Sequence, residues 1–427
     1  MSYRIAGIDV HKKMLAVVVA DVGQAEEDYE FQRRSFGSNP GQLRELAEWL
    51  TSNQVEEVVM ESTAQYWKPV WGMLEQYWKP LCQKREGAGK KSGALHLAQA
   101  QSNRARRGRK WDFADAERLV KRQVANELTL SFVPDAEQRL WRTVSAKRYQ
   151  LTRNRVCLQN RLEALLEEAH IKLSSLVSDL LGVSALRMLR ALADGGSDPA
   201  AIAGLADKTL RATPAELSDA LGACANLNPV YRRLIDMALQ ELQLINQQVD
   251  KLDQEMATLL KPYEPTVVRL AEVPGLGVNS AQQIIAQVGS SAATFSSPQE
   301  LSSWSGACPG QEESAGVSKS HRCPKGNRQM KRILNQAANA AAKSKGTVFH
   351  ILYQRLVPRL GHKQTIGVLA RKLCCLTWFI LHQGVRYQER GPSVNAAARR
   401  KRTNRMIREL RALGFRVEPT SVAPASA

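Results

Sequence analysis

The chain has 427 residues, of which 44% are hydrophobic and 24% charged, so it can bury a sizeable core. This composition excludes wholesale disorder and a fibrous architecture, and at roughly 150 residues per domain the length predicts about three domains. The 60 basic residues exceed the 41 acidic ones, and the formal net charge of +19 indicates a polyanionic partner. Nucleic acid is favoured over an anionic membrane surface.

Neither membrane insertion nor secretion is expected. The best apolar run, Leu373–Leu381, is far shorter than the roughly 20 residues of a membrane span and follows Arg371 and Lys372, so it predicts a buried helix. Residues 1–10 enter a strand-like pattern at once, unlike a signal peptide. The seven cysteines are an odd number without a C-x-x-C pair, so we expect reduced thiols and a cytoplasmic protein.

Residues 1–128 alternate strand-like and helical patterns, which predicts a mixed α/β domain. Two apolar runs, 4–10 and 14–22, predict a β-hairpin. The Val-rich run 55–60 predicts another strand, and apolar residues at helical spacing predict a helix at 43–50.

Residues 129–265 lose the strand signals and are predicted to be helical. Apolar residues recur at heptad spacing within 144–165 and 235–259, which is the pattern of a coiled coil. Glycines and a proline at 195–199 predict a turn region between these two long helices. A heptad pattern does not identify the partner helix, so a hairpin within one chain and a dimer-forming coiled coil are equal alternatives.

Residues 266–390 predict a mainly helical third domain, and residues 391–427 a basic tail. Between 399 and 416 the tail has eight basic residues and one acid. Such a run is typical either of a solvated helix or of an arm that contacts nucleic acid.

Two features of the third domain indicate phosphate binding. The turn Pro274–Gly277 precedes a helical pattern, and in a helix-hairpin-helix such a turn directs backbone N–H groups, here around Gly275 and Gly277, at a phosphate. A plain turn between packed helices is the equal alternative. Residues 319–332 contain six cations and no acid. The candidate nucleic-acid-binding residues there are Lys319, Arg322, Lys325, Asn327, Arg328 and Arg332.

Four acids of the first domain are candidate catalytic and metal-binding residues. Asp9 and Glu61 each end a predicted strand. Asp112 and Asp115 are one helical turn apart and share a helix face. If these elements meet, the carboxylates repel one another unless cations neutralise them, and without His or Cys beside them Mg²⁺ or Mn²⁺ is favoured over zinc. Two such ions about 4 Å apart can hold the attacking and leaving oxygens of a phosphodiester.

The order of strand Asp, strand Glu and helical Asp pair is the layout of an RNase H-like nuclease core. The local sequence also resembles the Asp-Glu-Asp-Asp transposases of the insertion-sequence 110 family. The resemblance spans the first domain and rests on GIDVHKK at 7–13, VMEST at 59–63, YWKPV at 66–70 and GRK at 108–110, which leads into Asp112.

The resemblance implies a RuvC-like fold whose metal is held by Asp9, Glu61, Asp112 and Asp115, with Arg109 and Lys110 beside the bound strand. The sequence departs from the family pattern at two positions. Ala64 stands where a glycine is expected. Trp111 stands where a threonine is expected, which affects the substrate contact rather than the metal site.

The third domain contains a pattern that is similar to a second signature of the same family. The pattern is formed by Pro309, Ser314, Gly316 and the Lys325–Arg328 segment. Chemistry alone gives Ser314 little weight, because residues 290–320 hold ten serines and a loop serine usually caps or forms a turn. The resemblance implies that Ser314 is the catalytic nucleophile, in one composite site with the metal-bound acids. Ala315 departs from the pattern, where a glycine often follows the serine.

The resemblance implies a DNA transposase or site-specific recombinase of a bacterial insertion sequence, in the cytoplasm and associated with the nucleoid. It also implies an element-encoded guide RNA and a homodimer or tetramer, without a membrane partner. A DNA invertase has the same signatures. The alternatives are a metal-only RuvC-like nuclease or junction resolvase, in which water attacks, and a non-catalytic nucleic-acid-binding protein.

Overall fold

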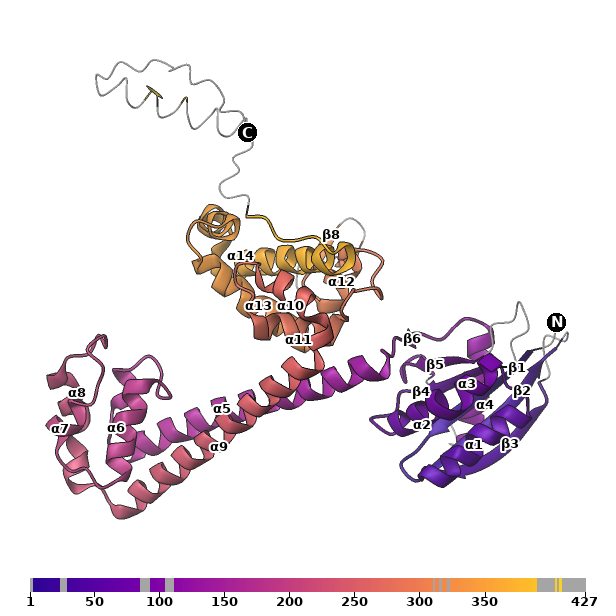
Figure 1. Cartoon of the computed structure of the whole chain (residues 1–427), viewed down its shortest axis with the longest axis horizontal. Helices are drawn as coiled ribbons and strands as arrows, with labels where there is room; N and C mark the ends of the chain where they lie inside the picture. The colour runs from indigo at the N-terminus through magenta and orange to yellow at the C-terminus, as the bar shows by residue number, and fades with distance from the viewer. Residues whose placement is uncertain are drawn as a thin grey trace. The chain divides into compact units, whose positions relative to one another are not determined.

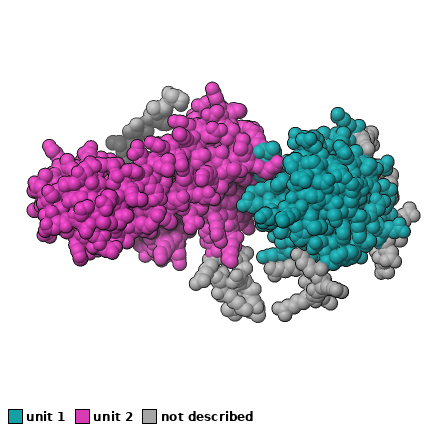
Figure 2. Space-filling view, turned by 90° about the horizontal axis from the view of Figure 1, so that it is seen from below, with its two compact units in different colours: residues 1–136 teal, residues 137–427 magenta. Residues whose placement is uncertain are grey.

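The computed structural model divides into two compact units, Met1–Ala136 and Glu137–Ala427, coloured separately in Figure 2. The first unit contains the six-stranded sheet and the second is mainly helical (Figure 1), as the sequence predicts. The predicted boundaries at 128, 265 and 390 stay predictions. The structure describes residues 3–23, 29–84, 93–103, 111–309, 312–314, 317–320 and 323–389, together with Asn404, Ile407 and Arg408.

The first unit is built on a mixed sheet with the strand order β3-β2-β1-β4-β5-β6. The antiparallel pair β1–β2 is the predicted hairpin, and β1, β4 and β5 are parallel neighbours. Parallel neighbours end at the same edge of a sheet, so the last residues of β1 and β4 lie close together. The strands are β1 (Tyr3–Val10), β2 (Met14–Val22), β3 (Phe31–Gly37), β4 (Glu57–Glu61), β5 (Ala94–Ala98) and β6 (Leu130–Ser131).

Helices cover both faces of this sheet. The helix α1 (Pro40–Ser52) buries the predicted apolar face, and α2 (Trp67–Met73) continues through a π-helical turn, Leu74–Trp78, into α3 (Lys79–Lys84). These elements share a core with Ala6, Ile8 and Val10 of β1. The helix α4 (Asp112–Val124) packs on the other face, against Ile5. Because strand side chains alternate, Gly7 and Asp9 face α4.

Gly7 allows an unusually close approach between β1 and α4. A Cβ built on Gly7 would overlap the carbonyl oxygen of Ala116 and lie 2.8 Å from Cγ2 of Val120. Any other residue would therefore push the first turns of α4 away from the strand that carries Asp9.

We expect Gly7→Ala to lower the free energy of unfolding by about 1–3 kcal/mol, because it overpacks the contact between β1 and α4. Gly72 in α2 is the matched control, since its Cβ would meet nothing within 4 Å, and Gly72→Ala should be neutral or stabilising. Urea unfolding of both variants measures the difference. A Gly7→Ala variant as stable as the wild type would contradict this packing argument.

The two predicted long helices pair within one chain. The helices α5 (Ala136–Glu168) and α9 (Pro229–Leu259) run side by side in Figure 1. Arg148 Nη2 donates to Asp253 Oδ2 at 3.0 Å, and most of the apolar heptad positions of both helices lie in one core. The heptad pattern is thus explained by a helical hairpin within one chain. Coiled-coil geometry and a dimer stay predictions. The shorter helices at the hairpin's far end are α6 (Val183–Ala193), α7 (Pro199–Ala203) and α8 (Pro214–Ala220).

The rest of the second unit shares another core, which includes Trp141 of α5 and Met256 of α9. Buried Gln138 and half-buried Arg142 of α5 donate hydrogen bonds to backbone carbonyls at the end of α11. The elements of this part are α10 (Glu264–Ala271), α11 (Val278–Val288), α12 (Pro298–Ser305), β7 (Glu312–Ser314), β8 (Val317–Ser320), α13 (Arg328–Lys343) and α14 (Val348–Gln383).

Among the described helices, α14 alone is long and apolar enough to cross a membrane by length and composition. In its most apolar window 56% of the residues are buried inside the structure, and Gly361, with a φ of 71°, interrupts the helix. Leu373 and Leu381 lie in the core of the unit. The predicted buried helix at 373–381 is confirmed.

Candidate metal centre

Three elements bring the predicted acids to one edge of the sheet. Asp9 is the penultimate residue of β1, and Glu61 is the last residue of β4. Asp112 and Asp115 lie in the first turn of α4, which packs across β1. All three other acids raise the pKa of Asp9, so the four carboxylates share one electrostatic environment.

Asp9 is the most buried member of this cluster. Only 6% of the residue is exposed, and its Oδ2 atom has no hydrogen-bond donor among the described residues. Burial is the main cause that raises the pKa of Asp9 to about 6; His11 lowers it, and Asp115, Glu61 and Asp112 raise it further. A buried carboxylate oxygen without a donor, next to other acids, suits a bound cation.

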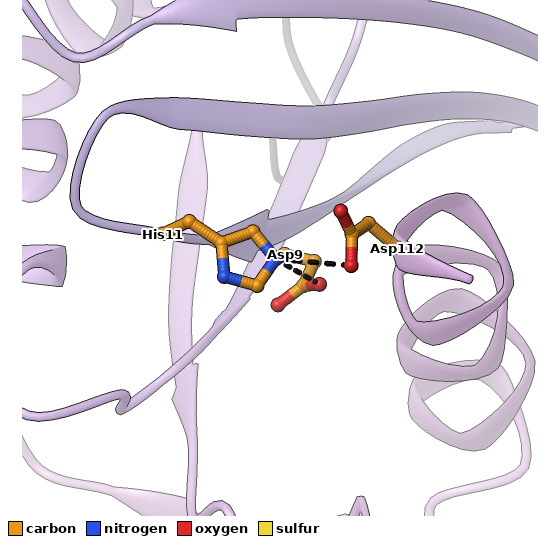
Figure 3. Close-up of side chains that lie close together, drawn as sticks. All are labelled: Asp9, His11 and Asp112. Carbon is orange, nitrogen blue, oxygen red and sulfur yellow. Dashed lines mark ion pairs between the residues drawn. The ribbon is translucent and has the colours of Figure 1, made fainter. Parts of the chain in front are cut away.

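His11 lies between two of the acids (Figure 3). Its Nε2 atom is 3.1 Å from Asp9 Oδ2, outside hydrogen-bond geometry, and 3.2 Å from Asp112 Oδ1. One ligand atom from each of these three residues falls within 4.8 Å of the others, a grouping that could hold a metal ion. The imidazole adds a nitrogen donor, which Mn²⁺ and other transition ions accept more readily than Mg²⁺ does.

The expectation that no histidine lies beside the acids is therefore wrong. His11 directly follows β1 and is held in place by the hairpin turn, because its backbone N–H donates to the Met14 carbonyl at 3.0 Å. Residues two apart on a strand point to the same face, so the spacing between Asp9 and His11 was the signal that the sequence analysis missed.

Glu61 and Asp115 are oriented by other side chains. Asn103 Nδ2 donates to Glu61 Oε2 at 2.9 Å, and Thr63 Oγ1 donates to Glu61 Oε1 at 3.3 Å. Arg118 Nη1 donates to Asp115 Oδ1 at 2.7 Å and to the Asn103 carbonyl at 3.3 Å. These two acids thus lie near Asp9 but outside the group formed with His11. No local pattern in the sequence marks Asn103 or Arg118 as part of this cluster.

The loop after β4 keeps a backbone conformation that favours glycine. Ala64 has a φ of +47°, in the left-handed region that L-residues rarely adopt. This is the position where the family resemblance predicts a glycine, which adopts such a conformation without strain.

Two family models match the chain. A DEDD transposase model of the IS110 group matches residues 6–171, and a model described as transposase, IS116/IS110/IS902 family, matches residues 268–354. The chain belongs to the IS110 family of transposases. Members of this family are enzymes that cut and rejoin DNA.

The other comparisons with this transposase add little. No curated protein matches it. Among solved structures, RuvC of T. thermophilus in complex with a Holliday junction substrate aligns over 99% of its own length and 30% of this chain, at 12% sequence identity and a TM-score of 0.21.

The P-G-x-G turn of the transposase is tightly packed. Gly275 has a φ of +89°, and a Cβ there would overlap the carbonyl oxygen of Ala337 in α13. Packing therefore accounts for Gly275. Gly277 precedes α11 and has open space around it, and Val278 is 53% exposed. Phosphate binding at this turn stays a prediction.

The basic stretch divides into exposed and internal residues. Lys325 and Arg328 are exposed. Asn327 caps α13, because its side chain accepts from the Met330 N–H at 2.9 Å. Arg332 lies over the ring of Tyr149, 4.8 Å from the ring centroid, and burial lowers the pKa of its guanidinium. Of the four residues that are placed, Lys325 and Arg328 best suit phosphate contact.

The other predicted site residues lie partly outside the described residues. Ser314 is the last residue of β7 and pairs with Val317 of β8, but its side chain and that of Lys319 are not described. Arg109, Lys110 and Arg322 lie wholly outside, as does nearly all of the basic tail. Their roles stay predictions.

The raised pKa of Asp9 makes the stability of the metal-free protein depend on pH. The folded-state pKa of about 6 lies above the ordinary value of 3.8, so the associated stability is complete below pH 3.8 and is lost as the pH rises through 6. Relative to Asp9→Asn, the unfolding free energy of the wild type should fall by up to about 3 kcal/mol between pH 4 and 7.

Urea unfolding in the presence of a chelator measures this difference. Asp21→Asn removes an exposed acid of the same sheet and should follow the wild-type profile. If the unfolding free energies of the wild type and Asp9→Asn changed in parallel with pH, the raised pKa of Asp9 would be contradicted.

Proposed function

We propose that this transposase cuts DNA at a divalent-metal centre formed by Asp9, Glu61, Asp112 and Asp115, with His11 as a further ligand. The observation that carries the proposal is the buried Asp9 oxygen without a donor, which faces His11 and Asp112. Three ligand atoms within 4.8 Å and two further carboxylates nearby provide both the donors and the negative charge that a divalent cation requires.

In this scheme the protein's side chains have two roles, which are to hold the cation and to orient the carboxylates around it. Asp9 and Asp112 would hold the cation, and Asn103 and Arg118 hold Glu61 and Asp115 in fixed directions. A bound Mg²⁺ or Mn²⁺ would polarise the scissile phosphodiester and stabilise the leaving oxygen.

Ser314 is proposed as the nucleophile on the strength of the family signature. Its Oγ atom attacks the phosphorus and forms a new P–O bond, while the P–O bond to one strand end breaks and its electron pair goes to the leaving oxygen. The serine hydroxyl proton is given up and the leaving oxygen takes up a proton, so that strand end becomes a free hydroxyl. The resulting phosphoserine conserves the bond energy, so rejoining needs no ATP. A serine hydroxyl needs activation by a base or a metal, which the metal centre would supply.

The partners are proposed on charge and family membership. DNA and an element-encoded guide RNA would balance much of the +19 charge, and base pairing by the RNA would choose the target. Lys325 and Arg328 are exposed and suit the phosphate backbone. The active form is proposed to be a homodimer or tetramer.

Glu61→Gln tests the metal centre. We expect cleavage to fall by more than the roughly 10- to 100-fold that a change around a metal's ligands costs, because a carboxylate close to the ion is neutralised. DNA binding should persist. Glu45→Gln removes the same charge from a surface ion pair with Arg34 and should cut normally. A wild type that never cuts with Mg²⁺ or Mn²⁺, with or without RNA, would favour a non-catalytic nucleic-acid-binding protein.

Ser314→Ala tests the nucleophile. We expect the wild type to form a covalent protein–DNA adduct, detected on a denaturing gel, and Ser314→Ala to form none. Ser303→Ala, which changes an exposed serine of α12, should form the adduct normally. Cleavage by Ser314→Ala at the wild-type rate would reject the serine and favour attack by water.

A further inference from the structure

We propose that Trp111 is a substrate-binding residue of this centre, which stacks on a nucleobase of the single-stranded DNA next to the phosphate to be cut. The proposal rests on the proposed function, since it needs a DNA strand at the acids. Trp111 immediately precedes Asp112 in the chain and is 54% exposed. A large aromatic side chain is therefore presented to solvent one residue from a candidate metal ligand.

Single exposed apolar residues are common on protein surfaces, so exposure alone carries no function. Trp111 differs because other side chains support its ring. The guanidinium carbon of Arg33 lies over the indole, 5.6 Å from the ring centroid. Phe113 meets it edge to face, with 5.9 Å between centroids. The ring is thus held in one orientation while more than half of the residue stays accessible.

Arg33 is itself anchored, which makes the support rigid. Its Nε atom donates to Glu117 Oε1 of α4 at 2.7 Å, so the guanidinium links β3 to the helix that carries Asp112. One turn farther along α4, Lys121 lies over the ring of Phe31 at 5.8 Å. The side of α4 that faces β3 therefore combines aromatic rings with cations.

This combination suits single-stranded nucleic acid. Aromatic rings stack on the faces of bases and neighbouring cations attract the phosphate backbone, and such binding tolerates many sequences because every base has a π-face. A nucleotide whose phosphate lies at Asp112 brings its base near Trp111, the adjacent residue.

The test uses single-stranded DNA oligonucleotides that each carry one fluorescent 2-aminopurine at a different position. We expect the wild type to quench one or two neighbouring positions and Trp111→Ala to lose this quenching and bind roughly 5- to 150-fold more weakly. Trp111→Phe should keep most of both. The matched control is Phe132→Ala, which removes an aromatic residue that is 59% exposed in the same unit, and it should behave as the wild type.

Calorimetric titration with Mn²⁺ shows whether Trp111→Ala still folds around its acids, and we expect unchanged binding. Wild-type quenching that persists in Trp111→Ala would overturn the inference. The inference would also be overturned if the wild type quenched 2-aminopurine in RNA oligonucleotides of the same sequences but not in the DNA oligonucleotides. If the wild type neither binds Mn²⁺ nor cuts DNA, the proposed function itself fails. If the wild type cuts DNA but its quenching does not depend on Trp111, only the inference about Trp111 fails.

Discussion

The contact between Gly7 and α4 is the interaction on which the candidate metal centre depends. It brings Ala116 and Val120 of the helix closer to the strand that carries Asp9 than a side chain at position 7 would permit. Asp112 then stands beside the end of β1, within reach of the same histidine as Asp9. A packing feature with no chemistry of its own thereby sets the spacing of the proposed ligands.

This arrangement opposes the stability of the metal-free protein. Burying Asp9 near three acids disfavours its charged form, and of the described residues only His11 offsets that effect. The apolar cores on both faces of the sheet hold the elements in place nonetheless. Residues that violate local rules while the surrounding fold is consistent are expected at functional sites, and the left-handed Ala64 three residues after Glu61 is another example.

Local patterns predicted the features that depend on neighbours in the chain. The hairpin of β1 and β2, the buried helix at 373–381 and the placement of Asp9 and Glu61 at strand ends all follow from the period of the apolar residues. Family motifs predicted the four acids as site residues, and the two family models confirmed the family.

Features that depend on long-range packing were not predictable in this way. Asn103 reaches Glu61 across 42 positions, and no local signal marks such a pair. For Gly275 the motif left phosphate binding and a plain turn between packed helices as equal alternatives, and only the structure reveals its close approach to α13. The heptad pattern does not determine the partner helix, and in the structure the partner of α5 is α9 of the same chain. His11 was missed because the site was assumed to contain oxygen donors alone.

Anomalous X-ray diffraction from crystals of the full chain soaked in Mn²⁺ tests the central claim most directly. The account predicts a manganese peak bounded by Asp9, His11 and Asp112, with the Glu61 carboxylate turned towards it. Acids that lie apart from one another, or manganese that binds only elsewhere on the protein, would contradict it.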